Sequence, residues 1–301
     1  MGETFTLSEL VIPGTYIRVR AEALISAGGI STGNIGIVGT ASTGFAETHI
    51  LSDYESAREA VGEYDALSTG QHNLTRGIEL LYLNGARTVF ARALDPAGNP
   101  GQDDYVAAFE ELLKDDVNIL VAPELATETA LAALGSVLET AESAGKDAIA
   151  VIGSDQTDVD DILGQVTDND RIIMTTPGIR AYDAAAGENV DLSGTYGAAA
   201  VAGLVSSLAP QSSPTNKVLP GVVKLAQRFS YGEMVQLVDG RMLVLEERQG
   251  IRVVRGLTTE SGAFTQITTR RITDFAKAGI RQVSNPFIGR LNNARVRKAL
   301  Q

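Results

Sequence analysis

The chain has 301 residues, of which 44% are hydrophobic and 21% are charged, proportions typical of a globular protein. It has no cysteine and only two histidines, His49 and His72, which excludes disulfide bonds and thiolate metal sites and leaves little material for a zinc site or a histidine-based catalytic triad. The net charge of −12 argues against a nucleic acid as the partner, because phosphates repel an acidic surface.

Charge is unevenly distributed along the chain. Residues 241–301 hold twelve Lys and Arg against four acidic residues, a net charge of +8, whereas residues 1–240 have a net charge of −20. Such an asymmetry indicates that the C-terminal part faces a different partner from the rest, and an acidic protein surface is a partner that fits.

No segment has the pattern of a signal peptide or a membrane span. The first ten residues lack a basic region followed by an apolar one, so no signal peptide is predicted. The longest run of small apolar residues, 196–209, is shorter than the roughly 20 residues that cross a bilayer. We therefore expect no direct insertion into a membrane, and assembly in the cytoplasm.

An extended strand is predicted close to the N-terminus. A Pro-Gly pair gives a turn signal, and from Tyr16 onward apolar residues alternate in part with Arg18 and Arg20. A half-polar strand of this kind needs an edge to pair with, and that edge can belong to another chain. Residues 1–25 are therefore predicted to form an extended N-terminal arm.

Strands and helices then alternate along the chain. Short apolar strands are predicted at 34–39, 88–93, 117–122, 148–152 and 171–175. Helices are predicted at 52–62, 73–84, 102–114, 127–144 and 155–163. The first of these helices has Ser52 as its expected N-cap, with Glu55 in the capping-box position. The alternation is typical of an α/β domain with a largely parallel sheet, which we place at residues 26–190.

The pattern changes in the C-terminal third. A helix of small residues is predicted at 196–208 and a loop at 210–220, and strands are predicted at 234–238, 242–246 and 251–257. Asp239-Gly240 is the strongest hairpin signal in the chain. A helix at 268–283 follows and is stopped by Pro286. These elements predict an α+β domain at 191–285 and an extended C-terminal arm at 286–301.

The helix predicted at 268–283 has two contrasting faces. One face carries Ile272, Phe275, Ala276 and Gly279. The other face carries Arg270, Asp274, Lys277 and Arg281, at spacings of four, three and four. The charged face is either solvated, with an internal Asp–Lys pair, or it contacts an acidic partner.

The glycines of the α/β part invite a nucleotide-binding hypothesis. Gly36, Gly39 and Gly44 do not match the dinucleotide-binding fingerprint, and no lysine follows as a P-loop requires. These glycines are expected to be turn residues. We therefore predict no cofactor.

An acidic cluster lies between two of the predicted strands. It contains Asp155, Asp158, Asp160, Asp161, Asp168 and Asp170. Its spacing does not fit a calcium loop, so a solvated patch is expected and no metal site is predicted. The chain has no G-x-S-x-G motif, and neither histidine has a recognisable catalytic setting. No catalytic residue is predicted, although carboxylates paired only by the fold stay open.

Five stretches carry a likeness to a known family. They are PGTYIRVRAE (13–22), TGNIGIVGTASTG (32–44), residues 196–220 with AAAVAGLVSS and SPTNK, residues 235–259, and ITTRRITDFAKAGI (267–280). In this order and spacing they resemble the tail sheath proteins of contractile phages and related contractile injection systems. The resemblance covers both ends and much of the C-terminal third, whereas residues 100–190 contribute little to it.

The resemblance implies a structural protein and not an enzyme. Subunits of such sheaths stack as hexameric rings around a tail tube, and their contraction drives the tube through a target envelope, powered by the free-energy difference between two packings of the same subunits. The implied partners are further copies of the chain, the tail tube protein, and the baseplate and tail terminator proteins. The implied location is a virion tail or a phage-tail-like particle, assembled in the host cytoplasm.

The resemblance also implies roles for particular residues. The arms would add strands to the sheets of neighbouring subunits through Tyr16, Arg18, Arg20, Phe287, Arg290, Arg295 and Arg297. The helix at 268–283 would contact an acidic tube surface through Arg270, Lys277 and Arg281. Two alternatives stay open, namely another self-assembling tail or capsid-like structural protein and, last, an α/β enzyme with an unrecognised site.

Overall fold

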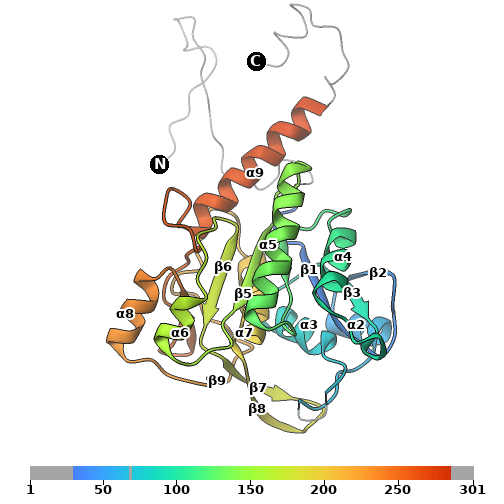
Figure 1. Cartoon of the computed structure of the whole chain (residues 1–301), viewed down its shortest axis with the longest axis horizontal. Coiled ribbons are helices and arrows are strands. Elements are labelled where there is room, and N and C mark those ends of the chain that lie inside the picture. Colours follow the sequence, from blue (N-terminus) through green and yellow to red (C-terminus); the bar gives the residue numbers. More distant parts are fainter. Residues whose placement is uncertain (1–29, 68–69, 286–301) are drawn as a thin grey trace, which may run out of the picture. The chain divides into compact units, whose positions relative to one another are not determined.

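The computed structural model describes residues 30–67 and 70–285. Its main element is an eight-stranded mixed sheet with the order β11-β10-β6-β5-β4-β1-β3-β2 (Figure 1). The strands of this sheet are β1 (Ile35–Thr40), β2 (Thr48–Leu51), β3 (Val89–Leu94), β4 (Ile119–Val121), β5 (Ile149–Gly153), β6 (Ile172–Thr176), β10 (Leu243–Glu247) and β11 (Ile251–Val253). All neighbours from β10 to β3 are parallel, and an antiparallel strand closes each edge. The prediction of a largely parallel sheet is confirmed.

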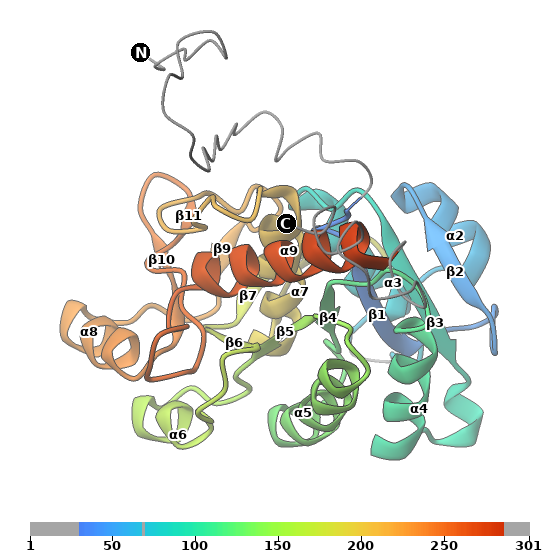
Figure 2. The same cartoon turned by 90° about the horizontal axis from the view of Figure 1, so that it is seen from above.

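Helices cover both faces of this sheet (Figure 2). They are α2 (Tyr54–Val61), α3 (Leu74–Leu83), α4 (Gln102–Leu112), α5 (Thr127–Ser143), α6 (Val159–Gly164), α7 (Gly194–Ser207), α8 (Tyr231–Asp239) and α9 (Ile267–Ser284), with a short 3-10 helix, η2, at Pro96–Gly98. Helices α2, α3 and α7 bury one apolar core against the sheet, which includes Ile78 and Val201. Helices α4, α5, α6 and α8 bury the other, which includes Phe109 and Leu134. The parallel strands are therefore apolar on both faces, which explains their continuous apolar runs in the sequence.

Helix α7 is the most deeply buried helix of the core. Every residue from Gly194 to Val205 is buried, as its composition of small apolar residues predicts. Glycines allow the close approach, because a Cβ on Gly153 at the end of β5 would overlap the carbonyl of Gly194. The helix of small residues predicted at 196–208 is confirmed.

A small antiparallel sheet, β8-β7-β9, lies beside the large one. Its strands are β7 (Ile179–Asp183), β8 (Glu188–Leu192) and β9 (Lys224–Leu225). Sequence patterns predicted none of these strands and also missed β2. All four are short and partly polar, so they carry little periodic signal.

The strand predicted at 234–238 is wrong. The segment belongs to helix α8, whose N-terminus is fixed by a capping box in which the backbone N–H of Ser230 donates to Glu233 Oε2 (2.6 Å) and Ser230 Oγ accepts from the backbone N–H of Glu233. The hairpin signal at Asp239-Gly240 is wrong for the same reason, since Gly240 is the C-cap of this helix. The real hairpin joins β10 to β11 and turns at Gln249 and Gly250, both with positive φ.

One N-cap and one helix start also differ from expectation. The side chain of Asp53, not Ser52, caps α2 by accepting from the backbone N–H of Ser56. The helix predicted at 155–163 begins only at Val159, after its cap Asp158. Gly85 and Gly145, which follow the C-terminal ends of α3 and α5, have positive φ, as a residue after a helix end often does.

Residues 31–285 belong to one compact unit. Strand β10, from the predicted α+β part, pairs with β6 of the predicted α/β part. The large sheet therefore contains strands from both sides of the boundary predicted between residues 190 and 191. The division of the chain into an N-terminal arm, two domains and a C-terminal arm stays a prediction. Among the described residues, no helix is both long and apolar enough to cross a bilayer.

Candidate interaction surface at helix α9

Helix α9 lies across the amino ends of the parallel strands (Figures 1 and 2). Its approach is set by Thr259, whose backbone N–H donates to the carbonyl of Ile172 in β6 (2.9 Å). In its first turns Arg271 donates to the carbonyl of Thr32, which precedes β1 (3.0 Å), and farther along Lys277 and Arg281 reach Asp147, which precedes β5. Helix α9 therefore covers the amino ends of the parallel strands, which form the amino edge of the sheet.

Arg171 is the centre of an ion-pair network under this helix. It precedes β6 and is only 3% exposed. Its guanidinium lies 2.8 Å from Glu142, 3.0 Å from Asp147 and 3.2 Å from Asp274, and it also donates to the carbonyl of Ala148. One buried cation thus joins α5, the start of β5 and α9.

Three further cations of α9 complete the network. Arg270 binds Asp170 and Asp274, each at 2.6 Å. Lys277 lies 2.5 Å from Asp147, and Arg281 binds the same carboxylate. The network comprises the cations Arg171, Arg270, Lys277 and Arg281 and the carboxylates Glu142, Asp147, Asp170 and Asp274. Four positive charges meet four negative ones.

The network shifts the titration of its members. Burial alone would raise the pKa of Asp147, but its hydrogen bonds from Lys277 and Arg281 hold that pKa below its ordinary value. The hydrogen bond from Arg171 holds the pKa of Glu142 low in the same way. Burial dominates at Asp274 and raises its pKa. Asp147 is therefore the carboxylate on which the distal part of α9 chiefly depends.

Arg271 differs from its neighbours because it has no carboxylate partner among the described residues. It is 6% exposed, and its Nη2 donates to the carbonyls of Thr32 and Leu208 (2.9 Å). Leu208 is the C-cap of α7, where helix carbonyls carry partial negative charge. Burial lowers the pKa of Arg271 to about 10. The residue fastens the start of α9 to the end of α7.

The predicted tube-contact residues are brought together, on the side of α9 that faces the body. Arg270 is 5% exposed, and Lys277 and Arg281 are bound to Asp147. Of the predicted apolar face, Ile272 is 46% exposed and Phe275 is half-buried, while Ile280, which was not assigned to that face, is 67% exposed. The sequence identified the charged face of the helix, but nothing in it indicated which face lies against the body.

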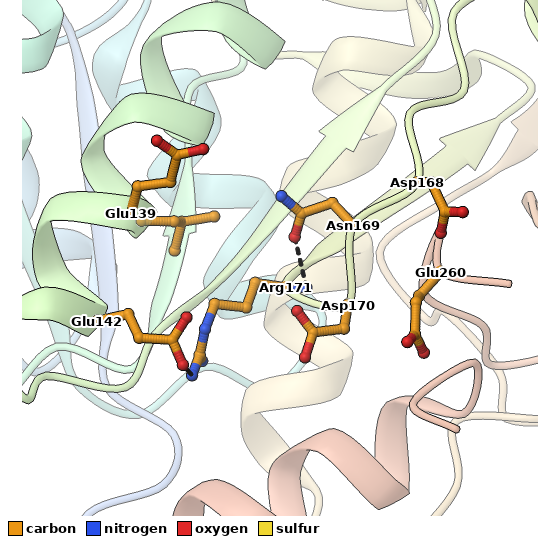
Figure 3. A pocket seen from close by; sticks show the side chains of 8 residues that line it. Glu139, Glu142, Asp168, Asn169, Asp170, Arg171 and Glu260 are labelled. Carbon is orange, nitrogen blue, oxygen red and sulfur yellow. Dashed lines mark hydrogen bonds and ion pairs between the residues drawn. The ribbon is translucent and has the colours of Figure 1, made fainter. Parts of the chain in front are cut away.

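An acidic cavity of about 330 Å³ lies beside the network (Figure 3). It is lined by Leu138, Glu139, Glu142, Asp168, Asn169, Asp170, Arg171 and Glu260. The Asp168 carboxylate accepts from Ser261, and Asp170 is held by Arg270, so both are structural. Within the residues that the structure describes, no group of His, Cys, Asp and Glu has the arrangement of a metal site.

The acidic residues at the start of the predicted cluster also have structural partners. Asp155 accepts from the backbone N–H of Thr127 (3.1 Å) and from Gln165 (2.8 Å). Asp158 caps α6. These contacts fix the loop after β5 to the start of α5.

The carboxyl edge of the sheet is filled by the chain's own side chains. Glu124 follows β4 and accepts from the backbone N–H of Thr40 (2.9 Å) and from its hydroxyl (2.5 Å). Burial raises the pKa of Glu124 to about 7. A Cβ on Gly39 would overlap this carboxylate, so the glycine admits Glu124 where a nucleotide phosphate would lie in other α/β folds.

The remaining predicted positions lie elsewhere. His49 Nε2 is 2.9 Å from the carbonyl of Gly44, and His72 Nδ1 is 2.9 Å from Asp65, so each histidine is tied to its own loop. The predicted arm residues lie outside the described residues. They are Tyr16, Arg18, Arg20, Phe287, Arg290, Arg295 and Arg297.

A family model decides what kind of protein this is. The model of the phage tail sheath protein central domain matches residues 98–259, more than half of the chain. The chain belongs to the phage tail sheath family. Members of this family are structural proteins and not enzymes. The match includes residues 100–190, the stretch in which the sequence patterns showed little resemblance.

Solved sheath structures share the fold. The anti-feeding prophage helical sheath in its contracted state is 18% identical, with a TM-score of 0.71 over 96% of this chain and 80% of the other. The sheath tail protein of Desulfitobacterium hafniense is 13% identical, with a TM-score of 0.72 over 95% of this chain and 86% of the other. The contracted sheath of an extracellular contractile injection system, PVC, is 16% identical, with a TM-score of 0.68 over 99% and 80%. None of the curated protein sequences matches the chain.

Proposed function

We propose that this chain is the subunit of a contractile sheath, which polymerises as stacked hexameric rings around a tail tube and contracts to drive the tube through a target envelope. The observation that carries the proposal is the family match over residues 98–259, supported by a fold that aligns along almost the whole chain with contracted sheaths. The sheath belongs to a virion tail or a phage-tail-like particle assembled in the host cytoplasm.

The partners follow from this function. They are further copies of the chain, the tail tube protein, and the baseplate and tail terminator proteins. A chain of the solved anti-feeding prophage baseplate is 18% identical to this one, which supports the baseplate as a partner. Residues 1–25 and 286–301 act as arms that add strands to neighbouring subunits. Such a role needs sheet edges, and the large sheet has two, β2 and β11, of which β2 exposes Ile50 by 65%.

Electron microscopy tests the polymer. Negative-stain images of the purified protein, alone and with its cognate tube protein, should show hollow striated cylinders. Dispersed compact particles in both samples would contradict the proposal.

Truncation tests the arms. Removing residues 1–20 or 286–301 should leave a folded protein, judged by circular dichroism and a cooperative melt, that no longer forms cylinders. A truncated chain that still polymerises would remove the arms from the assembly mechanism. A truncated chain that unfolds would show that these segments belong to the subunit's own fold.

A further inference from the structure

The helices on one face of the large sheet carry charge of one sign only. Helices α4, α5, α6 and α8 contain four, three, two and two acidic residues, and none of them contains a Lys or Arg. The helices on the other face, α2, α3 and α7, contain three acidic and two basic residues. A surface of one sign attracts a partner of the opposite sign. The face formed by α4, α5, α6 and α8 therefore fits a basic partner.

The acidic cavity of about 330 Å³ is a hollow in this face (Figure 3). Helix α5 places Glu139 and Glu142 on one side of it, and Asp168 and Glu260 lie on the other side. Five carboxylates and one guanidinium line the cavity in all. Leu138 adds an apolar wall, against which the stem of a long cationic side chain can pack. The cavity therefore has the charge and the lining that suit a Lys or Arg side chain.

Two groups in the cavity wall lack partners. Glu139 is exposed, and its carboxylate makes no hydrogen bond or ion pair with the described residues. Arg171 is only 3% exposed, and its Nε is buried without an acceptor. An unmet buried donor costs free energy, so an acceptor brought to Arg171 would be favourable. A basic peptide segment supplies both partners, a cationic side chain for Glu139 and a backbone carbonyl for Arg171, whereas a small cation supplies only the first.

The chain itself contains a segment of this chemistry. Residues 286–301 hold four basic residues and no acidic one. The basic residues are Arg290, Arg295, Arg297 and Lys298. The cations of the preceding helix are not available for this role, because Arg270, Lys277 and Arg281 already bind carboxylates of their own subunit. Residues 286–301 therefore match the cavity in charge.

The reach of the segment favours a second copy as its source. The cavity lies beside the start of α9, where Arg270 binds Asp170 in the cavity wall (2.6 Å). From Arg270 to Asn285 the helix advances about 22 Å away from that point. The five residues from Asn285 to Arg290 span at most about 17 Å, so the backbone of Arg290 ends short of its own cavity. Later residues reach it only if the chain doubles back along α9, whereas a neighbouring copy presents the segment without this reversal.

We propose that basic side chains of residues 286–301 of one subunit occupy the acidic cavity between α5 and residues 168–171 of a neighbouring subunit. The inference rests on the proposed sheath function and specifies a contact that holds the C-terminal arm. Arg295 and Arg297 supply the cations, Glu139 receives one of them, and the backbone of the segment accepts from Arg171. Each subunit gives one segment and receives one, which is a heterologous contact that continues from copy to copy.

Charge reversal tests the contact in the full chain. The test variants are Glu139→Lys in the cavity and Arg295→Glu/Arg297→Glu in the segment. The matched control is Glu128→Lys, which reverses an exposed charge on the same helix but outside the cavity. Circular dichroism checks folding, and sedimentation measures the critical concentration for polymerisation without tubes. Both test variants should fold and raise this concentration at least about tenfold, because the lost contact recurs in every copy. The control should change it less than about twofold.

Cross-linking tests which copy fills the cavity. The chain has no cysteine, so a disulfide can form only between introduced ones. Ser136 is exposed and lies one turn from Glu139 on α5, and Val296 lies between Arg295 and Arg297, so neither change removes a charge. Under mild oxidation, Ser136→Cys/Val296→Cys should give a ladder of linked subunits on a non-reducing gel. The control Ala126→Cys/Val296→Cys, with an exposed site at the other end of α5, should stay monomeric.

Four outcomes would overturn the inference. They are equal critical concentrations for Glu139→Lys and Glu128→Lys, equal cross-linking at positions 136 and 126, a disulfide formed only within one chain, and a Glu139→Lys variant that polymerises normally but loses binding to tubes, which would place the tube protein in the cavity. Failure of the unchanged chain to polymerise is a different result, because it overturns the sheath function itself. The cross-link between copies in concentrated solution then still decides whether the segment enters the cavity.

Discussion

The two ends of the parallel strands, which we call the amino edge and the carboxyl edge of the sheet, are built in opposite ways. At the carboxyl edge, backbone meets backbone, since Gly153 lies against Gly194 and Glu124 fills the space beside Gly39. At the amino edge, the part of α9 beyond Arg271 is held by long charged side chains that converge on Arg171 and Asp147. Enzymes of this architecture bind their ligands at the carboxyl edge. In this chain that edge is closed, and the amino edge carries the candidate interaction surface.

The difference has a mechanical meaning. Close packing tolerates no intermediate arrangement, whereas the partly exposed side chains of Lys277 and Arg281 can lengthen their ion pairs or exchange partners at small cost. The proposed contractile function would need a rigid body and a contact element that can yield. The carboxyl edge and α7 supply the first property, and the distal part of α9 supplies the second.

The largest expected effect breaks the carboxyl edge. In Gly153→Ala the added Cβ would overlap the backbone of Gly194, which cannot move without shifting α7. The free energy of unfolding should fall by about 3 kcal/mol, measured by urea denaturation. Gly135→Ala on α5 is the control, because a Cβ there meets nothing within 4 Å. The control should gain about 0.5–1 kcal/mol, since alanine favours a helix over glycine. Equal stabilities of the two variants would contradict the close contact.

The next largest effect is expected from a substitution at the centre of the ion-pair network under α9. Arg171→Met keeps the volume but leaves buried carboxylates without their shared cation, which should cost about 3 kcal/mol or somewhat less, because Asp147 and Asp274 keep other partners. Hydrogen exchange should accelerate in α9 more than in α7. The control is Arg180→Met, which removes an exposed pair with Asp191 at 3.8 Å and should cost under about 0.5 kcal/mol. Uniform acceleration over the whole body would mean that Arg171 supports the core and not α9 in particular.

A smaller effect at the carboxyl edge depends on pH. Burial raises the pKa of Glu124 to about 7, although the Thr40 hydrogen bonds and the charge of Arg76 oppose this. Because the folded pKa lies above the unfolded one, the stabilising contribution of this group is present below about pH 4.5 and is lost as the pH rises through 7. Unfolding free energy should therefore fall by about 2 kcal/mol between pH 5 and pH 8 on account of Glu124.

The variant Glu124→Gln isolates that group. Subtracting its pH profile from that of the unchanged chain removes the contributions of Asp274 and Glu79, whose pKa values burial also raises. The difference should slope downward between pH 5 and pH 8. A flat difference would show that Glu124 is ionised in the folded state throughout this range.

The sequence patterns were sufficient for the parallel core and insufficient for its edges. Apolar runs such as 148–152 and 171–175 predicted β5 and β6 to within a residue, because strands buried on both faces have an unambiguous composition. Residues 234–238 of helix α8 were predicted as a strand, because this short apolar run was given more weight than the capping box at Ser230 and Glu233. The charged face predicted for α9 is the one that pairs with the body, whereas the predicted apolar face omitted Ile280 and Val283, both of them exposed. Their orientation depends on Asp147 and Glu142, which are more than a hundred positions away in the sequence, and no local pattern reports such a pairing.

The smallest effect tests whether the distal part of α9 can yield. Lys277 is 33% exposed and its partner Asp147 is also held by Arg281 and Arg171, so Lys277→Ala should cost only about 0.5 kcal/mol of unfolding free energy. The same change should nevertheless raise proteolysis within residues 272–284, because no residue of that segment is buried and few contacts replace the lost pair. Raising the salt concentration should move the unchanged chain toward the behaviour of the variant, by screening the pairs of Lys277 and Arg281. If neither the variant nor salt alters cleavage there, the distal helix is held by something other than these charges, and the contrast between a rigid carboxyl edge and a yielding amino edge fails.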